Sequence, residues 1–168
     1  MALYDPAGMS TAGKIPVYIL PALASTDLSA VTVAEMGAGT QVDTAMTSLT
    51  YGAEQATRDR KMLSDTVAEQ IGGQRTHSID LGTLAAMDPQ GTDALKTLLV
   101  EDAVVYIVAL PGLASATAPA AAQKAWITRA TVGTVVPAGI TPDDGNEFGW
   151  NVTFNKVTNN FEAAVSGV

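Results

Sequence analysis

Near the end of the chain, residues 148–155 read Phe-Gly-Trp-Asn-Val-Thr-Phe-Asn. Large apolar side chains alternate here with small or polar ones, and a period of two indicates a β-strand with one buried face. The segment before it, Trp126 to Val136, is rich in β-branched residues and stops at Pro137, which predicts another strand. Residues 141–146, Thr-Pro-Asp-Asp-Gly-Asn, are typical of a turn. We therefore expect the chain to close with a hairpin-connected pair of strands.

Further strands are expected toward the N-terminus. Residues 103–110 are apolar at odd and even positions, as in a central strand buried on both faces. Side chains of different character alternate along residues 76–84, which indicates another strand. Residues 14–20, Lys-Ile-Pro-Val-Tyr-Ile-Leu, are β-branched and aromatic, with a proline that favours an edge position. Residues 41–43 and 49–53 are shorter candidates.

Helical signals are few and short. Thr92 fits an N-cap, and apolar residues follow at helical spacing up to Leu99, which predicts a helix of about two turns. Thr32 and Glu35 have the spacing of a capping box, and we expect a single helical turn there that stops at Gly37. The combined pattern predicts a mainly β protein: a β-sandwich or barrel with one flanking α-helix and long loops. The helix is expected to cover the aromatic side chains of Trp126, Phe148, Trp150 and Phe154.

The chain of 168 residues has the usual size of one domain. Residues 1–13 contain glycine, proline and small polar residues, and they predict an N-terminal arm that precedes a single β domain at 14–168. The polar stretch 55–75 predicts a long loop, with a weak helix over 62–70. We expect the arm and residues 56–75 to be mobile in the isolated subunit and ordered on assembly.

The composition excludes several kinds of site. The absence of cysteine excludes disulfides, thiolate nucleophiles and cysteine zinc sites, and the single histidine, His77, excludes multi-histidine metal sites. Seventeen acidic residues against nine basic ones give a net charge of −8, which argues against tight binding of nucleic acid. The longest apolar run, Ala103 to Pro111, is far shorter than the ~20 residues of a membrane-spanning helix. Residues 1–13 lack the pattern of a signal peptide, so we expect a protein made in the cytoplasm without membrane contact.

Three motifs that suggest chemistry fail on their spacing. Residues 37–40, Gly-Ala-Gly-Thr, begin like a dinucleotide-binding fingerprint, but valine replaces the third glycine, and a helix end with a turn accounts for them better. Residues 143–147 lack the ligand spacing of a calcium-binding loop. His77 and Asp80 are separated by an odd number of residues, which places them on opposite faces of a strand. We predict no catalytic residue, no cofactor and no metal site.

Arg58, Arg60 and Lys61 form a basic cluster with only Asp59 inside it. The simplest interpretation of such a cluster is a loop exposed to solvent. In a chain with an excess of carboxylates, it is also suited to pairing with acidic residues of a neighbouring subunit. We therefore name Arg58, Arg60 and Lys61 as candidate inter-subunit contacts.

Several segments, spread along the chain, carry a family resemblance. They are Gly13–Ile19, Thr32–Thr40 (Thr-Val-Ala-Glu-Met-Gly-Ala-Gly-Thr), Gly91–Leu99, Val105–Val108, and the closing strands at 126–136 and 148–157. In this order they resemble the major tail tube proteins of long-tailed, siphovirus-type bacteriophages, especially those of actinobacterial hosts. That family is similar to the tube protein of type VI secretion.

The resemblance implies a structural virion protein without enzymatic activity. Hexameric rings would stack into a tail tube around a tape-measure protein, with tail terminator and tail-tip proteins as further partners. The tube would be assembled in the host cytoplasm, and DNA would pass through it transiently. An acidic lumen is expected, because carboxylates repel the phosphates of passing DNA. A capsid decoration or head–tail joining protein, and a small ligand-binding β-barrel, remain the alternatives.

Overall fold

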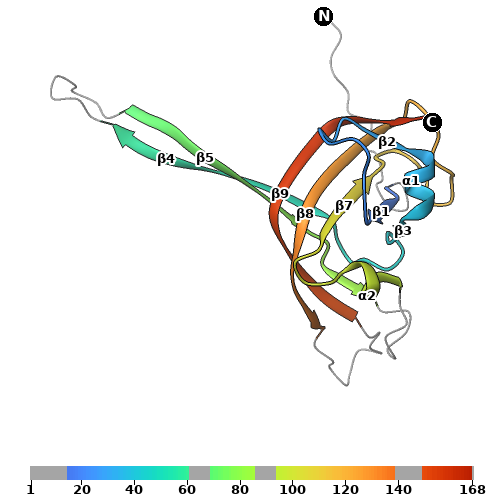
Figure 1. Ribbon diagram of the computed structural model, residues 1–168. Helices are drawn as coiled ribbons and strands as arrows, with labels where there is room; N and C mark the ends of the chain where they lie inside the picture. Colours follow the sequence, from blue (N-terminus) through green and yellow to red (C-terminus); the bar gives the residue numbers. More distant parts are fainter. Residues whose placement is uncertain (1–14, 61–68, 86–93, 139–148, 168) are drawn as a thin grey trace, which may run out of the picture.

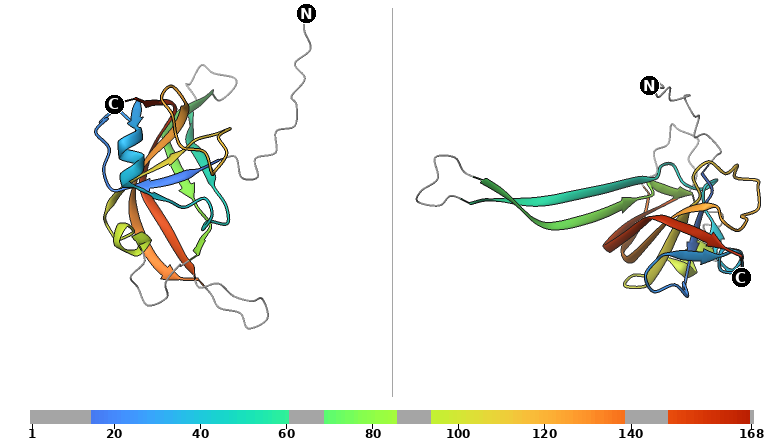
Figure 2. Two further views of the ribbon diagram at one scale, coloured as in Figure 1. Left: turned by 90° about the vertical axis from the view of Figure 1, so that its right-hand side faces the viewer. Right: turned by 90° about the horizontal axis from the view of Figure 1, so that it is seen from above.

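The computed structural model describes residues 15–60, 69–85, 94–138 and 149–167; the predicted arm at 1–13, the turn at 141–146 and Phe148 lie outside these ranges. The body is one curved sheet that forms half a barrel, and a long two-stranded hairpin projects from it (Figures 1 and 2). The helices are α1 (Val33–Ala38) and α2 (Ala94–Leu98), and the strands are β1 (Val17–Leu20), β2 (Ala30–Thr32), β3 (Thr40–Gln41), β4 (Thr50–Arg60), β5 (Glu69–Asp80), β6 (Thr83–Ala85), β7 (Val104–Ala109), β8 (Lys124–Pro137) and β9 (Gly149–Ser166). The predicted mainly β fold is confirmed.

The curved sheet has the order β2-β9-β8-β7-β1-β3, and β6 also pairs with β9. All pairs are antiparallel except β2 with β9. The prediction of an edge position for the first strand was wrong, because β1 has β7 on one side and β3 on the other. Pro16 does not prevent this, since it precedes the strand and its carbonyl accepts a hydrogen bond from the Leu110 amide at 3.0 Å.

The sheet is buried on both faces, as predicted for its central strand. On β7, Val105 and Ile107 belong to one apolar cluster, whereas Val108 belongs to another cluster on the opposite face. All three are at most 1% exposed. Burying a side chain of this kind stabilises the fold by about 1.5–3 kcal/mol.

A short helix covers each face, where the sequence predicted one flanking helix. Met36 of α1 is buried in one cluster, and Leu95 of α2 is buried in the other. The predicted capping box is present: Thr32 Oγ1 accepts from the Glu35 amide at 3.1 Å, and Glu35 Oε2 accepts from the Thr32 amide at 2.7 Å. The expected stop at Gly37 was wrong, because α1 continues through Gly37 to Ala38 and its C-cap is Gly39. The N-terminal cap and the buried Met36 hold the helix despite the low helix propensity of glycine.

The closing strands are longer than predicted. β8 and β9 pair over most of their length, with three register shifts that allow strong curvature. Of the aromatic residues expected under α2, Trp150 lies there, with the ammonium group of Lys96 5.4 Å from its ring centroid. Trp126 instead packs edge-on against Tyr51 and Phe161.

The main correction concerns the polar stretch 55–75, for which a loop was predicted. Its described residues form the outer parts of β4 and β5, which pair with each other in antiparallel register from Thr50↔Asp80 to Arg60↔Glu69. Of the weak helix expected at 62–70, residues 69 and 70 belong to β5, and the rest lies outside the described residues. The strand signal is missing because the described side chains of this outer part, 55–58 and 72–75, are exposed on both faces, so no apolar alternation is needed.

A β-bulge explains the glycine pair in this hairpin. The register changes from Gln55↔Arg75 to Thr57↔Gly72, which places one extra residue in β5. A Cβ on Gly73 would lie 3.0 Å from the Ala56 carbonyl oxygen, closer than side chains normally approach. Glycine therefore lets the two backbones approach at the bulge.

Candidate assembly surfaces

The hairpin is the most solvent-exposed part of the described fold. Every described side chain is exposed from Ala53 to Arg58 on β4 and from Gly72 to Thr76 on β5. From Ala53 to Arg60 the ribbon extends about 23 Å, at roughly 3.3 Å per residue. The right-hand view in Figure 2 shows it leaving the body. β4 and β5 pair only with each other among the described strands, so each has an outer edge with free backbone donors and acceptors.

An aromatic cluster anchors the base of the hairpin. Tyr51 of β4 makes edge-on contacts with Trp126 of β8 and Phe161 of β9, with ring centroids 5.9 and 5.1 Å apart, and Trp126 and Phe161 are 5.9 Å apart. Burial raises the pKa of Tyr51 to about 12, and the neighbouring Thr128 hydroxyl offsets part of that rise. Such contacts contribute about 0.5–1.5 kcal/mol each beyond area burial. They fix where the hairpin leaves the body.

Two of the three candidate contact residues lie on this hairpin. Arg58 is an exposed residue of β4, and Arg60 is the last residue of the strand, in register with Glu69. Lys61 lies outside the described residues. Their role as inter-subunit contacts remains a prediction.

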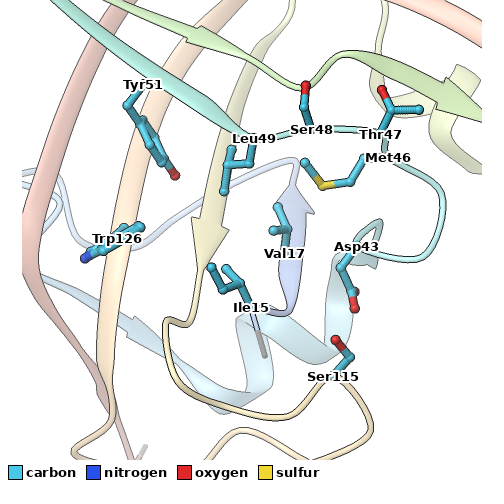
Figure 3. A pocket seen from close by; sticks show the side chains of 10 residues that line it. All are labelled: Ile15, Val17, Asp43, Met46, Thr47, Ser48, Leu49, Tyr51, Ser115 and Trp126. Atoms are coloured by element: carbon cyan, nitrogen blue, oxygen red, sulfur yellow. The ribbon is translucent and has the colours of Figure 1, made fainter. Parts of the chain in front are cut away.

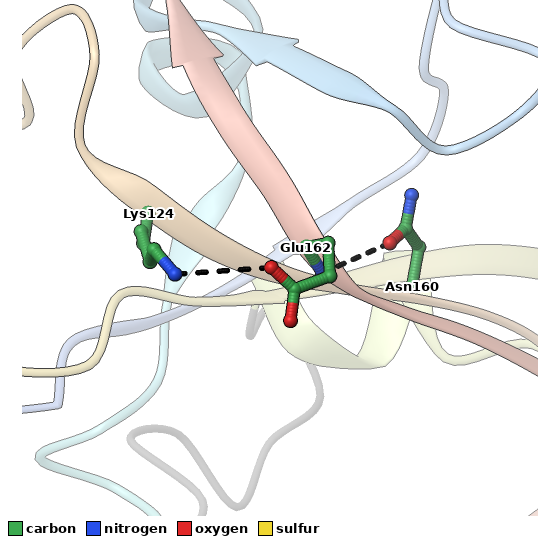
Figure 4. A network of polar contacts seen from close by, with 3 residues as sticks. All are labelled: Lys124, Asn160 and Glu162. Carbon is green, nitrogen blue, oxygen red and sulfur yellow. Dashed lines mark hydrogen bonds and ion pairs between the residues drawn. The ribbon is translucent and has the colours of Figure 1, made fainter.

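Among the side chains that the structure describes, Arg58 has no charged partner. The ion pair found there joins Lys124 and Glu162 at 3.8 Å, and the Glu162 amide donates to Asn160 Oδ1 at 2.9 Å (Figure 4). Both charged side chains of that pair are exposed, so it contributes at most about 1 kcal/mol.

The curved sheet also has open edges. β6 pairs with the first residues of β9, Gly149–Asn151, and β2 pairs with the last, Ala164–Ser166. Between them, residues 152–163 of β9 have no strand partner on that side in the described structure. The opposite edge is β3, only two residues long. The sheet is therefore not closed within one subunit.

The other motifs do not assemble a chemical site. His77 is in register with Ala53, and Asp80 with Thr50, so they lie on opposite faces as predicted. Asp80 Oδ1 accepts from the Gly82 amide at 2.8 Å. Gly39 caps α1, which confirms the helix-end interpretation of residues 37–40.

The described ranges hold no group of three His, Asp or Glu residues that could bind a metal ion. The expected absence of a calcium site at 143–147 falls outside these ranges. Within the same ranges, no helix has the length and apolar character needed to cross a membrane.

Sequence reasoning predicted strands at the base of the hairpin, 49–53 and 76–84, but missed its outer part and the cluster of Tyr51, Trp126 and Phe161. A signal for the hairpin was present at its base, where Tyr51 and Ile79 are in register and both are at least partly buried. The glycine pair at the bulge was a second signal, because glycine inside a strand often marks a bulge.

Exposed strand edges, a projecting ribbon and an open sheet are features of a subunit that joins other copies. No curated protein matches the chain. The family model of the phage tail tube protein matches residues 3–167, almost the whole length. The chain therefore belongs to the phage tail tube protein family.

Proposed function

We propose that this structural tail protein forms hexameric rings, and that the rings stack into a tube that conducts DNA during infection. A tape-measure protein would occupy the lumen during assembly, and terminator and tail-tip proteins would close the two ends. Membership of the family supports self-assembly into a virion tail tube. The ring size and these further partners rest on the family resemblance. The protein would act through its surfaces and not as an enzyme.

The single observation that carries this proposal is the exposed hairpin. A two-stranded ribbon is marginally stable on its own in water, and free strand edges tend to pair with other chains. The hairpin of this chain is long and exposes both edges beyond its base. In an assembly, the neighbouring subunit or ring would cover these groups.

The open edge of β9 supports ring closure. A contact that joins one surface of a subunit to a different surface of the next repeats around an axis and closes into a ring when the rotation allows. The unpaired stretch 152–163 is long enough to receive a strand of a neighbour. Each subunit would then contribute its curved sheet to a continuous wall.

The charge of the chain suits a conduit. The net charge of −8 disfavours lasting contacts with phosphates. With acidic side chains toward the lumen, DNA would slide without binding, while basic residues such as Arg58 would face other subunits. We expect no tight binding of duplex DNA at moderate salt, and tight binding would contradict the conduit.

Native mass spectrometry and negative-stain microscopy over a concentration series test the assembly. Hexameric rings or tubes are expected to increase with concentration. Trimers would favour a capsid decoration or joining protein instead. Monomers at every concentration and salt level would favour the ligand-binding barrel and would overturn the proposed function.

A further inference from the structure

A pocket of about 360 Å³ lies beside the base of the hairpin (Figure 3). Tyr51 and Trp126 line one end of it, and Leu49 and Ile15 line its apolar middle. At the other end, the side chains of Asp43 and Ser115 face each other. The pocket thus combines an apolar wall with a single carboxylate.

The Asp43 carboxylate is held in place but is incompletely satisfied. The neighbouring Val42 is fully buried, and its amide donates to the Val17 carbonyl at 2.8 Å, which fixes the backbone. Asp43 Oδ1 is buried and has no hydrogen-bond partner among the described residues. Burial raises the pKa of Tyr18, and the negative charge of Asp43 raises it further. The Asp43 carboxylate therefore acts electrostatically on the Tyr18 hydroxyl. A buried acceptor without a donor destabilises a structure, more so when it is charged.

The shape and charge of this pocket fit a cation on an apolar stem. Arginine and lysine bury their methylene groups against apolar walls and bring the charge to a carboxylate at the end. Arginine fits better, because its planar guanidinium donates to a carboxylate oxygen and to a nearby hydroxyl in a fixed geometry. The Ser115 hydroxyl supplies such a second acceptor.

The hairpin of the same chain carries a matching cation. Lys124 pairs with Glu162, and Lys96 lies over the Trp150 ring. Arg58 is exposed and has no ion-pair partner among the side chains that the structure describes. We propose that Arg58 on the hairpin of one subunit enters this pocket of a second copy and pairs there with Asp43. This inference rests on the proposed self-assembly.

The geometry of the hairpin requires that the two residues come from different copies. Arg58 lies about 23 Å beyond Tyr51 along β4, at roughly 3.3 Å per residue. The hairpin leads away from the body that holds Asp43 (Figure 1). Arg75 is a less suitable donor: it is in register with Gln55 and so lies only about 13 Å beyond Tyr51.

Charge exchange between two variants tests this pairing. Asp43→Lys alone and Arg58→Glu alone are each expected to raise the concentration needed for assembly by at least about tenfold, because like charges then meet. A mixture of the two variants is expected to assemble, since each pocket can receive a hairpin of opposite charge. The double variant is expected to assemble by itself. Asp43→Asn preserves the shape of the side chain and is expected to weaken assembly without changing the melting temperature of the monomer by more than a few degrees.

Arg75→Glu is the matched control. It makes the same charge change on the same hairpin, and combining it with Asp43→Lys in one chain is not expected to restore assembly. Restored assembly by that double variant would overturn the assignment to Arg58. So would failure of the Asp43→Lys and Arg58→Glu variants to assemble together.

If Asp43→Asn impairs assembly while Arg58→Glu does not, the pocket takes another occupant, such as residues 1–14 of a neighbour, and the pairing is wrong. The unmodified protein separates the two proposals. If it forms no rings or tubes at any concentration, the proposed function fails. If it assembles normally and the variants behave like it, only the pairing fails.

Discussion

Shortening the hairpin should separate folding from assembly. Ala53 and His77 are opposite each other in register, so residues 54–76 can be replaced by Asn-Gly, the pair that favours a two-residue turn between antiparallel strands. The replacement keeps Tyr51 and Ile79, which hold the base of the hairpin against the core. It removes the exposed ribbon.

The expected effect on stability is small and positive. The described residues that are removed are exposed on β4 and β5, so little buried apolar area is lost. The connection between the two remaining strand ends becomes roughly tenfold shorter, which favours folding by about 2 kcal/mol through loop-closure entropy. For a domain of this size, that corresponds to a rise in melting temperature of roughly 4–8 °C.

Thermal unfolding followed by circular dichroism measures the change in melting temperature, and sedimentation with electron microscopy measures assembly. The shortened variant is expected to fold as a monomer and to form no tubes. Gln55→Asn, which alters one exposed hairpin side chain without shortening the ribbon, is the control and should still assemble. Tubes of normal length from the shortened variant would refute the role of the hairpin in assembly. A melting temperature lowered by more than about 10 °C would refute the claim that the ribbon is dispensable for folding.

Three further predictions concern the body. Ile107→Ala should destabilise the monomer by roughly 2–5 kcal/mol in denaturant titrations, because it leaves a cavity in the core. Val104→Ala on the same strand should lower the free energy of unfolding by less than about 1 kcal/mol, because Val104 is 38% exposed. Equal losses would contradict the assigned burial. Thr32→Ala should lower the free energy of unfolding by about 1 kcal/mol, because α1 loses its N-terminal cap. An unchanged melting temperature would show that the cap is not needed for stability. The pKa of Tyr51 is raised from 10.0 to about 12, so the contribution of its neutral hydroxyl to the free energy of unfolding is complete below pH 10. That contribution is lost as the pH rises toward 12, by up to about 3 kcal/mol. Tyr51→Phe should therefore flatten the fall in monomer stability over that range, and an equally steep fall in this variant would disprove the assignment.

The sequence predicted those elements whose burial is complete within one subunit. β7 has apolar residues on both faces because both of its faces are covered, and this pattern is visible without a structure. The alternation in residues 148–155 predicted the start of β9 because that part of the strand has one covered face. The capping box of Thr32 and Glu35 was predicted correctly because it is a local interaction with fixed spacing.

Other features depend on distant parts of the chain. The edge position predicted for β1 was wrong because a proline at the start of a strand does not show which strands lie beside it. The contact of Tyr51 with Phe161 joins segments far apart in sequence. The pocket at Asp43 likewise requires the fold to bring Ser115 and Trp126 to the same place. No local pattern specifies such contacts.

The hairpin failed to appear as strands for a different reason, and that reason bears on function. Apolar alternation indicates a strand only where one face is buried within the same chain. β4 and β5 carry polar residues on both faces beyond Gly52, yet they stay paired in antiparallel orientation as far as Arg60↔Glu69, with one register shift at the bulge. Their pairing is thus set by the aromatic anchor at Tyr51 and by the bulge at Gly72 and Gly73, whereas the described side chains beyond the base stay exposed in the single subunit. A tube-forming protein benefits from a strand pair that has no covered apolar face in its own subunit. A ribbon with an apolar face would aggregate before the rings could assemble.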